Sequence, residues 1–267
     1  MTLNMIGTGI YSIEDISVKA KKVIDSCDVI FLEYYTSILK ESKEEIEKFL
    51  GKKVILATRS LVEQESDTIL APAIDKEVAF LVIGDVFGAT THTDICLRAK
   101  EKNINIKVYH NASILTAIGI TGLELYKFGK TTSLVFFDDS WKPETGYDVI
   151  KQNQKQGLHT LVLLDIKVAE PAKEDIKKGA EKPLPPRFMT VNQGIDQLLE
   201  IENKRKEKIF TNSTLCIGCA RLGSETPTIK TGNAKMLLNT DFGKPLHCLI
   251  VPGKLHFVEE EAIKLWQ

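Results

Sequence analysis

Short apolar runs alternate with amphipathic stretches through the first half of the chain. The apolar runs predict strands at residues 3–6, 29–32, 54–56, 78–83 and 106–109. Between them, apolar residues at helical spacing predict helices at residues 13–27, 42–50, 61–74 and 93–102. Strands that alternate with helices predict a parallel sheet with crossover helices, and strands apolar on both faces fit a sheet covered on both sides. Ligands bind such sheets beyond the carboxyl ends of the strands.

The second half predicts a second domain of mixed α/β type. Its strands are expected at residues 133–136, 160–166, 214–220 and 247–251, and its helices at residues 147–156, 191–205 and 257–266. We therefore expect an N-terminal α/β domain over residues 1–112 and a C-terminal mixed α/β domain over residues 113–267. Residues 167–187 hold ten charged residues and four prolines, a composition that predicts an exposed excursion.

Two of the predicted helices begin with capping residues. Ser12 precedes Glu14 and Asp15, which places an N-cap before acids in the first turn. Ser42 and Glu45 have capping-box spacing.

Composition excludes several classes of protein. The chain has 267 residues, and 35 Lys and Arg against 36 Asp and Glu give a net charge of −1. This balance excludes a strongly basic protein that binds nucleic acid mainly by neutralising phosphates. No apolar run reaches about 18 residues, and the N-terminus lacks a basic segment, so we expect neither a membrane span nor a signal peptide. Five cysteines make no disulfide scaffold, and we expect a reducing compartment, the cytosol.

A Gly-Thr-Gly turn at residues 7–9 follows the first predicted strand. With Glu33 at the end of the second strand, it suggests a dinucleotide site in which the turn holds phosphates and the acid holds a ribose. The third glycine of such a site is missing, because Ser12 stands where Gly or Ala is expected, and Glu14 and Asp15 place negative charge where a pyrophosphate needs positive potential. We therefore favour a tight turn that needs small residues.

The densest group of polar residues is the loop at residues 84–94, which reads Gly-Asp-Val-Phe-Gly-Ala-Thr-Thr-His-Thr-Asp. It follows the most apolar strand and precedes a helix. The alternative to a functional loop is an N-cap formed by Thr91 or Thr93. We favour function, because a cap needs one such residue and not five, and because binding sites are built on loops at strand ends.

No metal site is predicted. Cys216 and Cys219 form a single C-x-x-C within a predicted strand, where residues three apart face opposite sides and cannot easily converge on one ion. We expect both to be structural thiols. None of the five histidines has a metal-binding partner at close spacing, and His247, at the start of an apolar strand, is a candidate site residue.

The loop at residues 84–94 resembles the signature loop of the diphthine synthase (diphthine methyl ester synthase) family, and the resemblance covers nearly the whole chain. Further matching segments lie at residues 6–10 (Ile-Gly-Thr-Gly-Ile), 15–17, 32–39, 110–114 (His-Asn-Ala-Ser-Ile), 163–167 (Leu-Leu-Asp-Ile-Lys), 185–193 (Pro-Pro-Arg-Phe-Met-Thr-Val-Asn-Gln), 220–223 (Ala-Arg-Leu-Gly) and 245–247 (Pro-Leu-His). The resemblance implies a two-domain tetrapyrrole-methylase-like fold. Its N-terminal sheet would be mostly parallel and doubly wound, its C-terminal domain mixed α/β, and the cofactor would lie in the cleft between them.

The resemblance also implies an activity. Members of the family are homodimeric S-adenosylmethionine-dependent methyltransferases that act on a histidine of translation elongation factor 2, which carries an amino-carboxypropyl group. They methylate its amine in diphthamide biosynthesis and release S-adenosylhomocysteine. The segment at residues 185–193 resembles the eukaryotic type, which also esterifies the carboxylate to give diphthine methyl ester, so we expect the ester-forming version.

Motif matching implies eight cofactor contacts, many of them through the main chain. They are Ile10, Asp85, Gly88, Ser113, Ile114, Leu164, Leu222 and His247. We expect Asp85 to hold the positively charged cofactor and not to act as a base. The chain departs from the family at Thr8 and Val86, where leucine and proline are usual.

Three alternatives remain open at this stage. The chain could be a dinucleotide-dependent oxidoreductase, a non-catalytic module that binds the translation factor, or a relative that acts on a tetrapyrrole. A protein substrate needs a docking surface, for which residues 167–187 are a candidate by composition.

Overall fold

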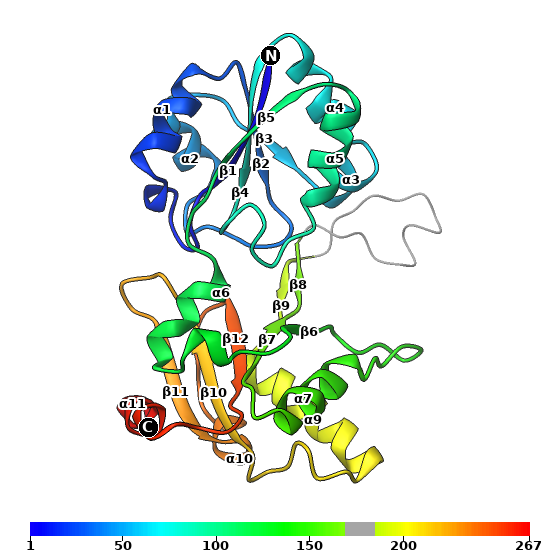
Figure 1. Cartoon of the computed structure of the whole chain (residues 1–267), viewed down its shortest axis with the longest axis vertical. Helices are drawn as coiled ribbons and strands as arrows, with labels where there is room; N and C mark the ends of the chain where they lie inside the picture. The colour runs from blue at the N-terminus through cyan, green and yellow to red at the C-terminus, as the bar shows by residue number, and fades with distance from the viewer. Residues whose placement is uncertain (169–184) are drawn as a thin grey trace. The chain divides into compact units, whose positions relative to one another are not determined.

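The computed structural model describes residues 1–168 and 185–267 and divides the chain into two compact units, Met1–Ala117 and Ile118–Gln267 (Figure 1). Each unit contains its own five-stranded sheet and its own hydrophobic core. Most of the charged, proline-rich segment at residues 167–187 lies outside the described residues. Within the described ranges, no helix is long and apolar enough to cross a membrane.

The first unit is built on a parallel sheet. Its strands are β1 (Thr2–Gly7), β2 (Val29–Glu33), β3 (Ile55–Ala57), β4 (Glu77–Val82) and β5 (Asn105–Tyr109). Their order across the sheet is β3-β2-β4-β1-β5, and every neighbouring pair is parallel. The five predicted strands and the crossover architecture are confirmed. All five carboxyl ends therefore lie at one edge of the sheet.

Helices connect these strands. They are η1 (Ile13–Asp15), α1 (Val18–Ser26), α2 (Lys43–Leu50), α3 (Arg59–Glu63), α4 (Asp67–Leu70), η2 (Pro72–Ile74), α5 (Thr93–Glu101) and α6 (Ile114–Ala117). The single helix predicted at residues 61–74 is wrong. Three short elements occupy that stretch, and Pro72 starts the last of them because proline is accepted in a first helical turn but not in an interior.

Local capping chemistry is confirmed at both predicted sites. The Ser12 and Asp15 side chains form a capping box at η1, and the Ser42 and Glu45 side chains form one at α2. Gly51 ends α2 in the left-handed conformation, with φ of 69°.

The sheet of the first unit is covered on both faces (Figure 1). Successive strand residues point to opposite sides, so Met5 and Phe80 pack in the cluster on the side of α5, while Ile6 and Leu81 pack in the cluster on the side of α1 and α2. This arrangement confirms the doubly wound sheet.

The second unit contains a mixed sheet, as predicted. Its strands are β6 (Thr132–Leu134), β7 (Thr160–Leu164), β10 (Leu215–Ala220), β11 (Thr228–Asn233) and β12 (His247–Val251). The order is β11-β10-β12-β7-β6, in which β6 and β7 are parallel and the other neighbours antiparallel. A two-stranded ribbon joins β8 (Ile166–Lys167) to β9 (Arg187–Phe188).

Strand β11 was not predicted. Only Ile229 and Thr231 alternate inward along it, so it presents no apolar run that would mark it in the sequence. The helices of this unit are η3 (Ile118–Thr121), η4 (Leu125–Lys127), α7 (Thr145–Lys155), α9 (Val191–Arg205), α10 (Ala234–Leu237), α11 (Phe257–Ala262) and η5 (Ile263–Trp266).

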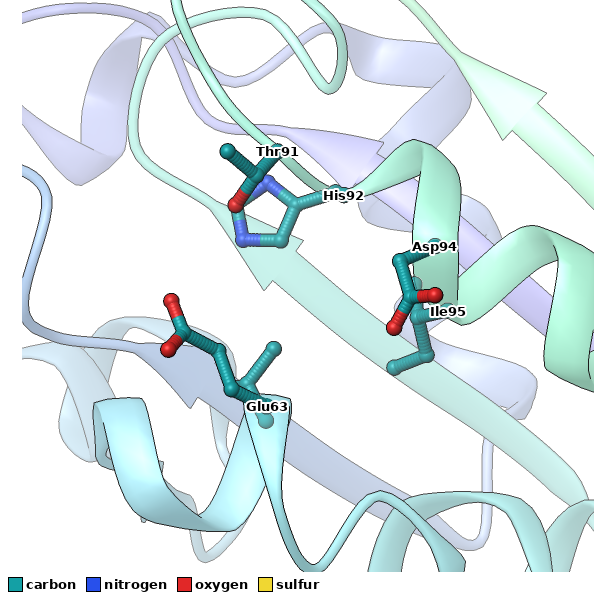
Figure 2. Close-up of a pocket in the computed structure, with 6 residues that line it drawn as sticks. Glu63, Thr91, His92, Asp94 and Ile95 are labelled. Atoms are coloured by element: carbon teal, nitrogen blue, oxygen red, sulfur yellow. The ribbon is translucent and has the colours of Figure 1, made fainter.

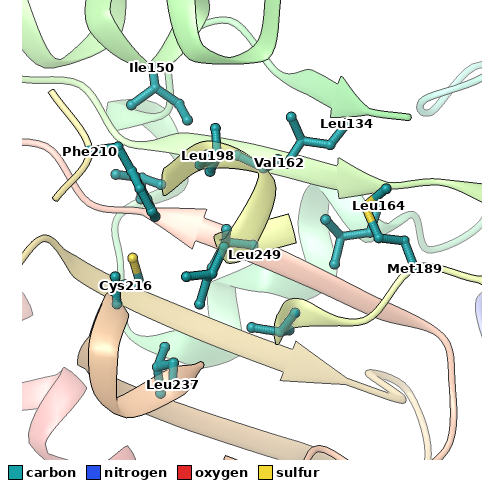
Figure 3. Close-up of a cluster of buried hydrophobic side chains, with 14 of the residues drawn as sticks. Leu134, Ile150, Val162, Leu164, Met189, Leu198, Phe210, Cys216, Leu237 and Leu249 are labelled. Carbon is teal, nitrogen blue, oxygen red and sulfur yellow. The ribbon is translucent and has the colours of Figure 1, made fainter. Parts of the chain in front are cut away.

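The core of the second unit lies between its sheet and helices α7, α9 and α10 (Figure 3). Leu198 of α9 faces Val162 of β7 and Leu249 of β12, and Phe210 packs beside them. Cys216 and Cys219 on β10 are both buried, and burial raises the pKa of the Cys216 thiol above its ordinary range. Both thiols are free, as expected for structural cysteines.

Candidate functional site

The carboxyl ends of β1 and β4 are joined by backbone hydrogen bonds. Gly84 N–H donates to the Gly9 carbonyl at 2.7 Å, and Gly9 N–H donates to the Gly84 carbonyl at 3.3 Å. Both glycines have positive φ, 87° and 96°, so each chain turns sharply where the two strands end. The two loops that follow therefore start from one fixed point.

The backbone amides in and after the turn at residues 7–9 donate hydrogen bonds to other groups of the protein. Thr8 N–H donates to the Val82 carbonyl at 2.9 Å, and the Ser12 amide donates to Asp15 at 3.0 Å. Gly9 N–H is held by Gly84. These amides cannot also hold a pyrophosphate, which supports the tight turn over the dinucleotide site. Thr8, a departure from the family pattern, is fully buried with its hydroxyl directed to carbonyl oxygens.

Glu33 is turned into the protein. Its side chain is fully buried and accepts hydrogen bonds from the amides of Tyr35 and Thr36, at 3.0 and 2.6 Å, and from the Thr36 hydroxyl at 2.8 Å. Burial raises the pKa of Glu33 despite these donors. A carboxylate in this position orders the chain after β2 and is not available to a ribose.

Asp85 ties the loop after β4 to the loop after β5. Its Oδ1 accepts the Phe87 amide at 3.0 Å, and its Oδ2 accepts the Asn111 amide at 3.1 Å and lies 2.9 Å from His110 Nδ1. Burial alone would raise the pKa of Asp85, but these donors outweigh it and lower the pKa below its ordinary value. Asp85 therefore keeps its negative charge, which fits a role in binding a cation and not in accepting a proton.

Asn111 completes this junction, and its role was missed in the sequence. Its Nδ2 donates to the Gly7 carbonyl and to the Asp15 carbonyl, both at 3.1 Å. The loops after β1, β4 and β5 are thus linked through Asp85 and Asn111. Asp85 and Asn111 are 26 residues apart in the chain, so no local sequence pattern indicates that they are in contact.

Four predicted cofactor residues lie on these three loops, and a fifth, Ile114, begins helix α6 after the third loop. Ile10 follows β1, Asp85 and Gly88 follow β4, and Ser113 and Ile114 follow β5. A Cβ added to Gly88 would lie 2.4 Å from Ser113 Oγ, so the two loops pack closely only because position 88 has no side chain. Ile10, Gly88 and Ile114 keep part of their surface exposed. A closely packed edge with a fixed carboxylate fits a small positively charged cofactor.

The other end of the 84–94 loop borders a cavity of about 180 Å³. Figure 2 shows the residues around it, which are Val62, Glu63, Thr91, His92, Asp94 and Ile95. The structure does not support the alternative interpretation of this loop as an N-cap formed by Thr91 or Thr93, because His92 occupies the N-cap position of α5 and no side chain caps the helix there. The Thr91 hydroxyl lines the cavity instead. Val86, the second departure from the family pattern, is buried in the core beneath the loop.

The three predicted cofactor residues of the second unit share one edge of its sheet. His247 begins β12 opposite Ala220, the last residue of β10, and Leu222 follows in the next turn. Leu164 ends β7 beside β12, where the register pairs Leu163 with Cys248. All three predicted residues are more than nine-tenths buried, and His247, at 9% exposed, is the least buried of them.

The His247 ring is held on both sides by backbone. Its Nδ1 accepts the Val191 amide at 3.3 Å, and its Nε2 donates to the carbonyls of Gly243 and Lys244 at 3.2 and 3.1 Å. Burial lowers the pKa of His247, so the ring is neutral. Arg221 holds the same loop by donating to the Lys244 carbonyl at 2.7 Å. The histidine of the Pro-Leu-His motif therefore fixes the backbone at this edge of the sheet. A ligand bound there would contact main-chain atoms.

Comparisons with known proteins point the same way. The family model of tetrapyrrole (corrin/porphyrin) methylases matches residues 2–235. The diphthine methyl ester synthase of Dictyostelium discoideum is 49% identical over 269 residues, which cover 100% of this chain and 98% of the relative. That of Homo sapiens is 47% identical and covers 99% of this chain and 94% of its own length. A solved diphthine synthase structure is 34% identical, has a TM-score of 0.86, and covers 100% of this chain and 96% of that chain.

Identity at this level extends over the full length of the chain, and the fold agrees with it in both units. The doubly wound parallel sheet and the mixed sheet are those expected of a tetrapyrrole methylase. The glycine and aspartate loops that carried the resemblance lie together at the edge where such a sheet binds ligands. This chain belongs to the diphthine methyl ester synthase family of tetrapyrrole methylases.

Proposed function

We propose that this protein is an S-adenosylmethionine-dependent methyltransferase that acts on the amino-carboxypropyl-modified histidine of translation elongation factor 2. In this proposal it methylates both the amine and the carboxylate, giving diphthine methyl ester. Full-length similarity to diphthine methyl ester synthases is the observation that carries the proposal. The Asp85 junction supports it, because a cationic methyl donor needs a carboxylate that stays charged.

The edge formed by the loops after β1, β4 and β5 would hold the methyl donor. S-adenosylmethionine supplies a methyl group bonded to a positively charged sulfur. The negative charge of Asp85 favours that cation, and the close packing of Gly88 on Ser113 shapes the surface it meets. Ile10 and Ile114 offer apolar contact beside them. Leu164, Leu222 and His247 stay predicted contacts on the second unit.

Methyl transfer needs the acceptor held in line with the methyl group, and positioning with exclusion of water does most of the work. An amine must lose a proton before each attack, whereas a carboxylate is already nucleophilic. Burial lowers the pKa of His92 to about 4, which makes this histidine a weak base. Asp85 is weaker still, because its pKa lies below the ordinary value. The chain's contribution at this loop is therefore to bind and orient the reactants.

The proposal includes further assignments. The protein substrate is elongation factor 2, the protein acts as a homodimer, and it works in the cytoplasm where that factor functions. The candidate docking segment at residues 167–187 lies mostly outside the described residues.

The decisive experiment is intact-mass analysis of elongation factor 2 that carries the amino-carboxypropyl histidine. Incubation with this protein and S-adenosylmethionine should add four methyl groups. Three additions would indicate the trimethyl amine and overturn the ester-forming assignment. No addition despite bound S-adenosylhomocysteine would overturn the substrate. Thermal stabilisation by NAD alone would favour the oxidoreductase.

Asp85→Asn tests the cofactor edge. Loss of the charge should weaken S-adenosylmethionine binding about tenfold, measured by calorimetry. Asp75→Asn, which changes an acid outside the 84–94 loop, is the control and should bind normally. Unchanged affinity with lost turnover in the Asp85→Asn protein would contradict a binding role.

A further inference from the structure

The cavity at the far end of the 84–94 loop is lined by a buried polar side chain, the His92 ring. Neither ring nitrogen of His92 forms a hydrogen bond of ordinary geometry among residues 1–168 and 185–267, although the nearby Val86 backbone acts against the effect of burial on its pKa. The Tyr35 hydroxyl, on a ring that contacts His92 but does not line the cavity, also lacks a partner among these residues. His92 is 1% exposed and Tyr35 is 5% exposed. Leaving a buried polar group unpaired costs about 1–3 kcal/mol, so these atoms point to a ligand that can form hydrogen bonds.

The ring of His92 is rigidly placed at the cavity wall. It meets Phe80 edge-on, with ring centroids 5.4 Å apart, and Tyr35 at 6.4 Å. Burial lowers its pKa to about 4, so the imidazole is neutral near pH 7 and has one nitrogen free to accept a hydrogen bond. A neutral imidazole next to a carboxylate can accept a hydrogen bond from a positively charged donor without repelling it.

Carboxylates and apolar side chains form the rest of the lining. Glu63 extends from α3 toward the His92 ring, whereas Asp94 lies on the other side of the cavity (Figure 2). Asp94 is neutralised by Arg98, whose Nε donates to it at 2.7 Å. Val62 and Ile95 supply apolar contact. The lining therefore combines the acceptors Glu63 and His92 with apolar surface, and the Arg98 guanidinium, which also donates to the Glu63 carbonyl at 3.3 Å, lies beside it.

The size of the cavity fits a small functional group. A cavity of about 150 Å³ is known to hold benzene, and this one measures about 180 Å³. Its position is also informative. One end of the 84–94 loop carries Asp85 and Gly88, and the other end carries Thr91 and His92. A single short loop thus forms part of both the predicted donor edge and this cavity.

We propose that the cavity binds an alkylammonium group of the protein substrate, with Glu63 and His92 accepting its N–H donors and Val62 and Ile95 contacting its hydrocarbon chain. This inference rests on the proposed function, because the amino-carboxypropyl side chain carries such a group. A lysine side chain near the modified histidine offers the same chemistry. Glu63 and His92 are then specificity residues for the acceptor.

The first test uses n-butylammonium chloride as the probe and the full chain as the protein. Carbon-13 NMR of the five histidine rings should show a saturable shift of the His92 resonance, and n-butanol, which lacks the charge, should produce none. Glu63→Gln should weaken the affinity about tenfold, by loss of one charged hydrogen bond. Glu101→Gln removes an exposed acid from α5 and should change nothing. An unmoved His92 signal, or equal binding by the Glu63→Gln protein, overturns the proposal.

The second test measures methylation of modified elongation factor 2. Glu63→Gln should raise KM for the factor about tenfold and leave the affinity for S-adenosylhomocysteine unchanged. If the bound group is the acceptor amine, the effect should shrink with each methyl added, because each methyl replaces an N–H donor. An equal effect at every step identifies a lysine. An unchanged KM overturns the proposal.

The two tests separate this inference from the proposed function. Failure of the wild-type protein to methylate the factor, with butylammonium still bound at His92, would overturn the proposed substrate and leave the cation site standing. Methylation at normal rates without butylammonium binding would overturn the cation site alone.

Discussion

Two buried histidines, one in each unit, occupy closely similar surroundings and differ in their hydrogen bonds. His92 lies 5.4 Å from Phe80 and His159 lies 5.3 Å from Phe128, both edge to face. The Nε2 of His159 is 2.8 Å from a Glu259 carboxylate oxygen, whereas His92 has no partner among the described residues. Burial lowers the pKa of both rings. Burial alone therefore does not distinguish a structural histidine from a binding one; the partners do.

Glu259 makes the second-unit histidine part of the architecture. This carboxylate is fully buried and accepts hydrogen bonds from the amides of Glu124 and His256 and from the Lys127 ammonium, in addition to His159. Burial by itself would raise the pKa of Glu259, but these donors lower it to about 2. The cluster binds η4, β7 and α11 together, and it leaves no polar atom of Glu259 for a ligand.

The largest effect is expected from removing Glu259. Glu259→Ala leaves Lys127 and His159 without their buried partner and should lower the free energy of unfolding by about 3 kcal/mol in urea titrations. Glu260→Ala, at the exposed neighbouring position, should change it by less than about 0.5 kcal/mol. A loss as small as that of the control would contradict a structural role for the cluster.

The same cluster should make the wild-type protein sensitive to acid. The folded pKa of Glu259 is about 2 and its ordinary value is 4.5, so its contribution is complete above the ordinary value and declines as pH falls toward 2. Urea midpoints measured from pH 5 to pH 2 should fall more steeply in the wild type than in Glu259→Ala.

A matched pair of substitutions should separate the two histidines. His159→Phe removes the acceptor of the Gly253 amide and the partner of Glu259, and should lower the free energy of unfolding by about 2 kcal/mol. His92→Phe removes no hydrogen bond stronger than the weak contact with the Val86 backbone and keeps the contact with Phe80, so it should not lower the free energy of unfolding by more than about 1 kcal/mol. Equal losses in both variants would show that His92 has a structural partner after all.

The smallest effect concerns the pH dependence in the neutral range. Since the pKa of His92 falls from 6.5 in the unfolded chain to about 4 in the folded protein, the unfolded state binds the extra proton between these values. Stability should therefore fall with decreasing pH, and His92→Phe should reduce that slope by about 1 kcal/mol per pH unit. Urea midpoints at pH 6.5 and 5.5 test this, and an identical slope in both proteins would contradict a buried neutral imidazole.

Local features of the sequence predicted most of the fold. Apolar runs located nine strands, and the serine caps at positions 12 and 42 located two helix starts, because each signal lies within a few residues. The prediction failed where the apolar pattern was weak or where it spanned several short elements. Strand β11 has only two inward residues, and the stretch before Pro72 is broken into short helices.

The candidate site was found in the sequence as a loop, but its parts could not be assigned roles. The density of small and polar residues at positions 84–94 singled out the segment that the structure places between β4 and α5. The sequence did not show that Asp85 meets Asn111, nor that Glu63 and His92 border one cavity. Glu63 lies in an ordinary amphipathic stretch, where nothing marks it as a site residue.

The amino-acid sequence by itself determined most of the order of strands and helices, two helix caps and the family, because these depend on local pattern and on motifs read in order. Only the tertiary structure decided which polar side chains form structural hydrogen bonds and which remain available to a ligand. His159 and Glu259 are 100 residues apart and still form one buried pair, while His92 remains without a partner among the described residues. Hydrogen-bond partners are set by strand order and packing, so the same residue type can stabilise one unit and offer a binding site in the other.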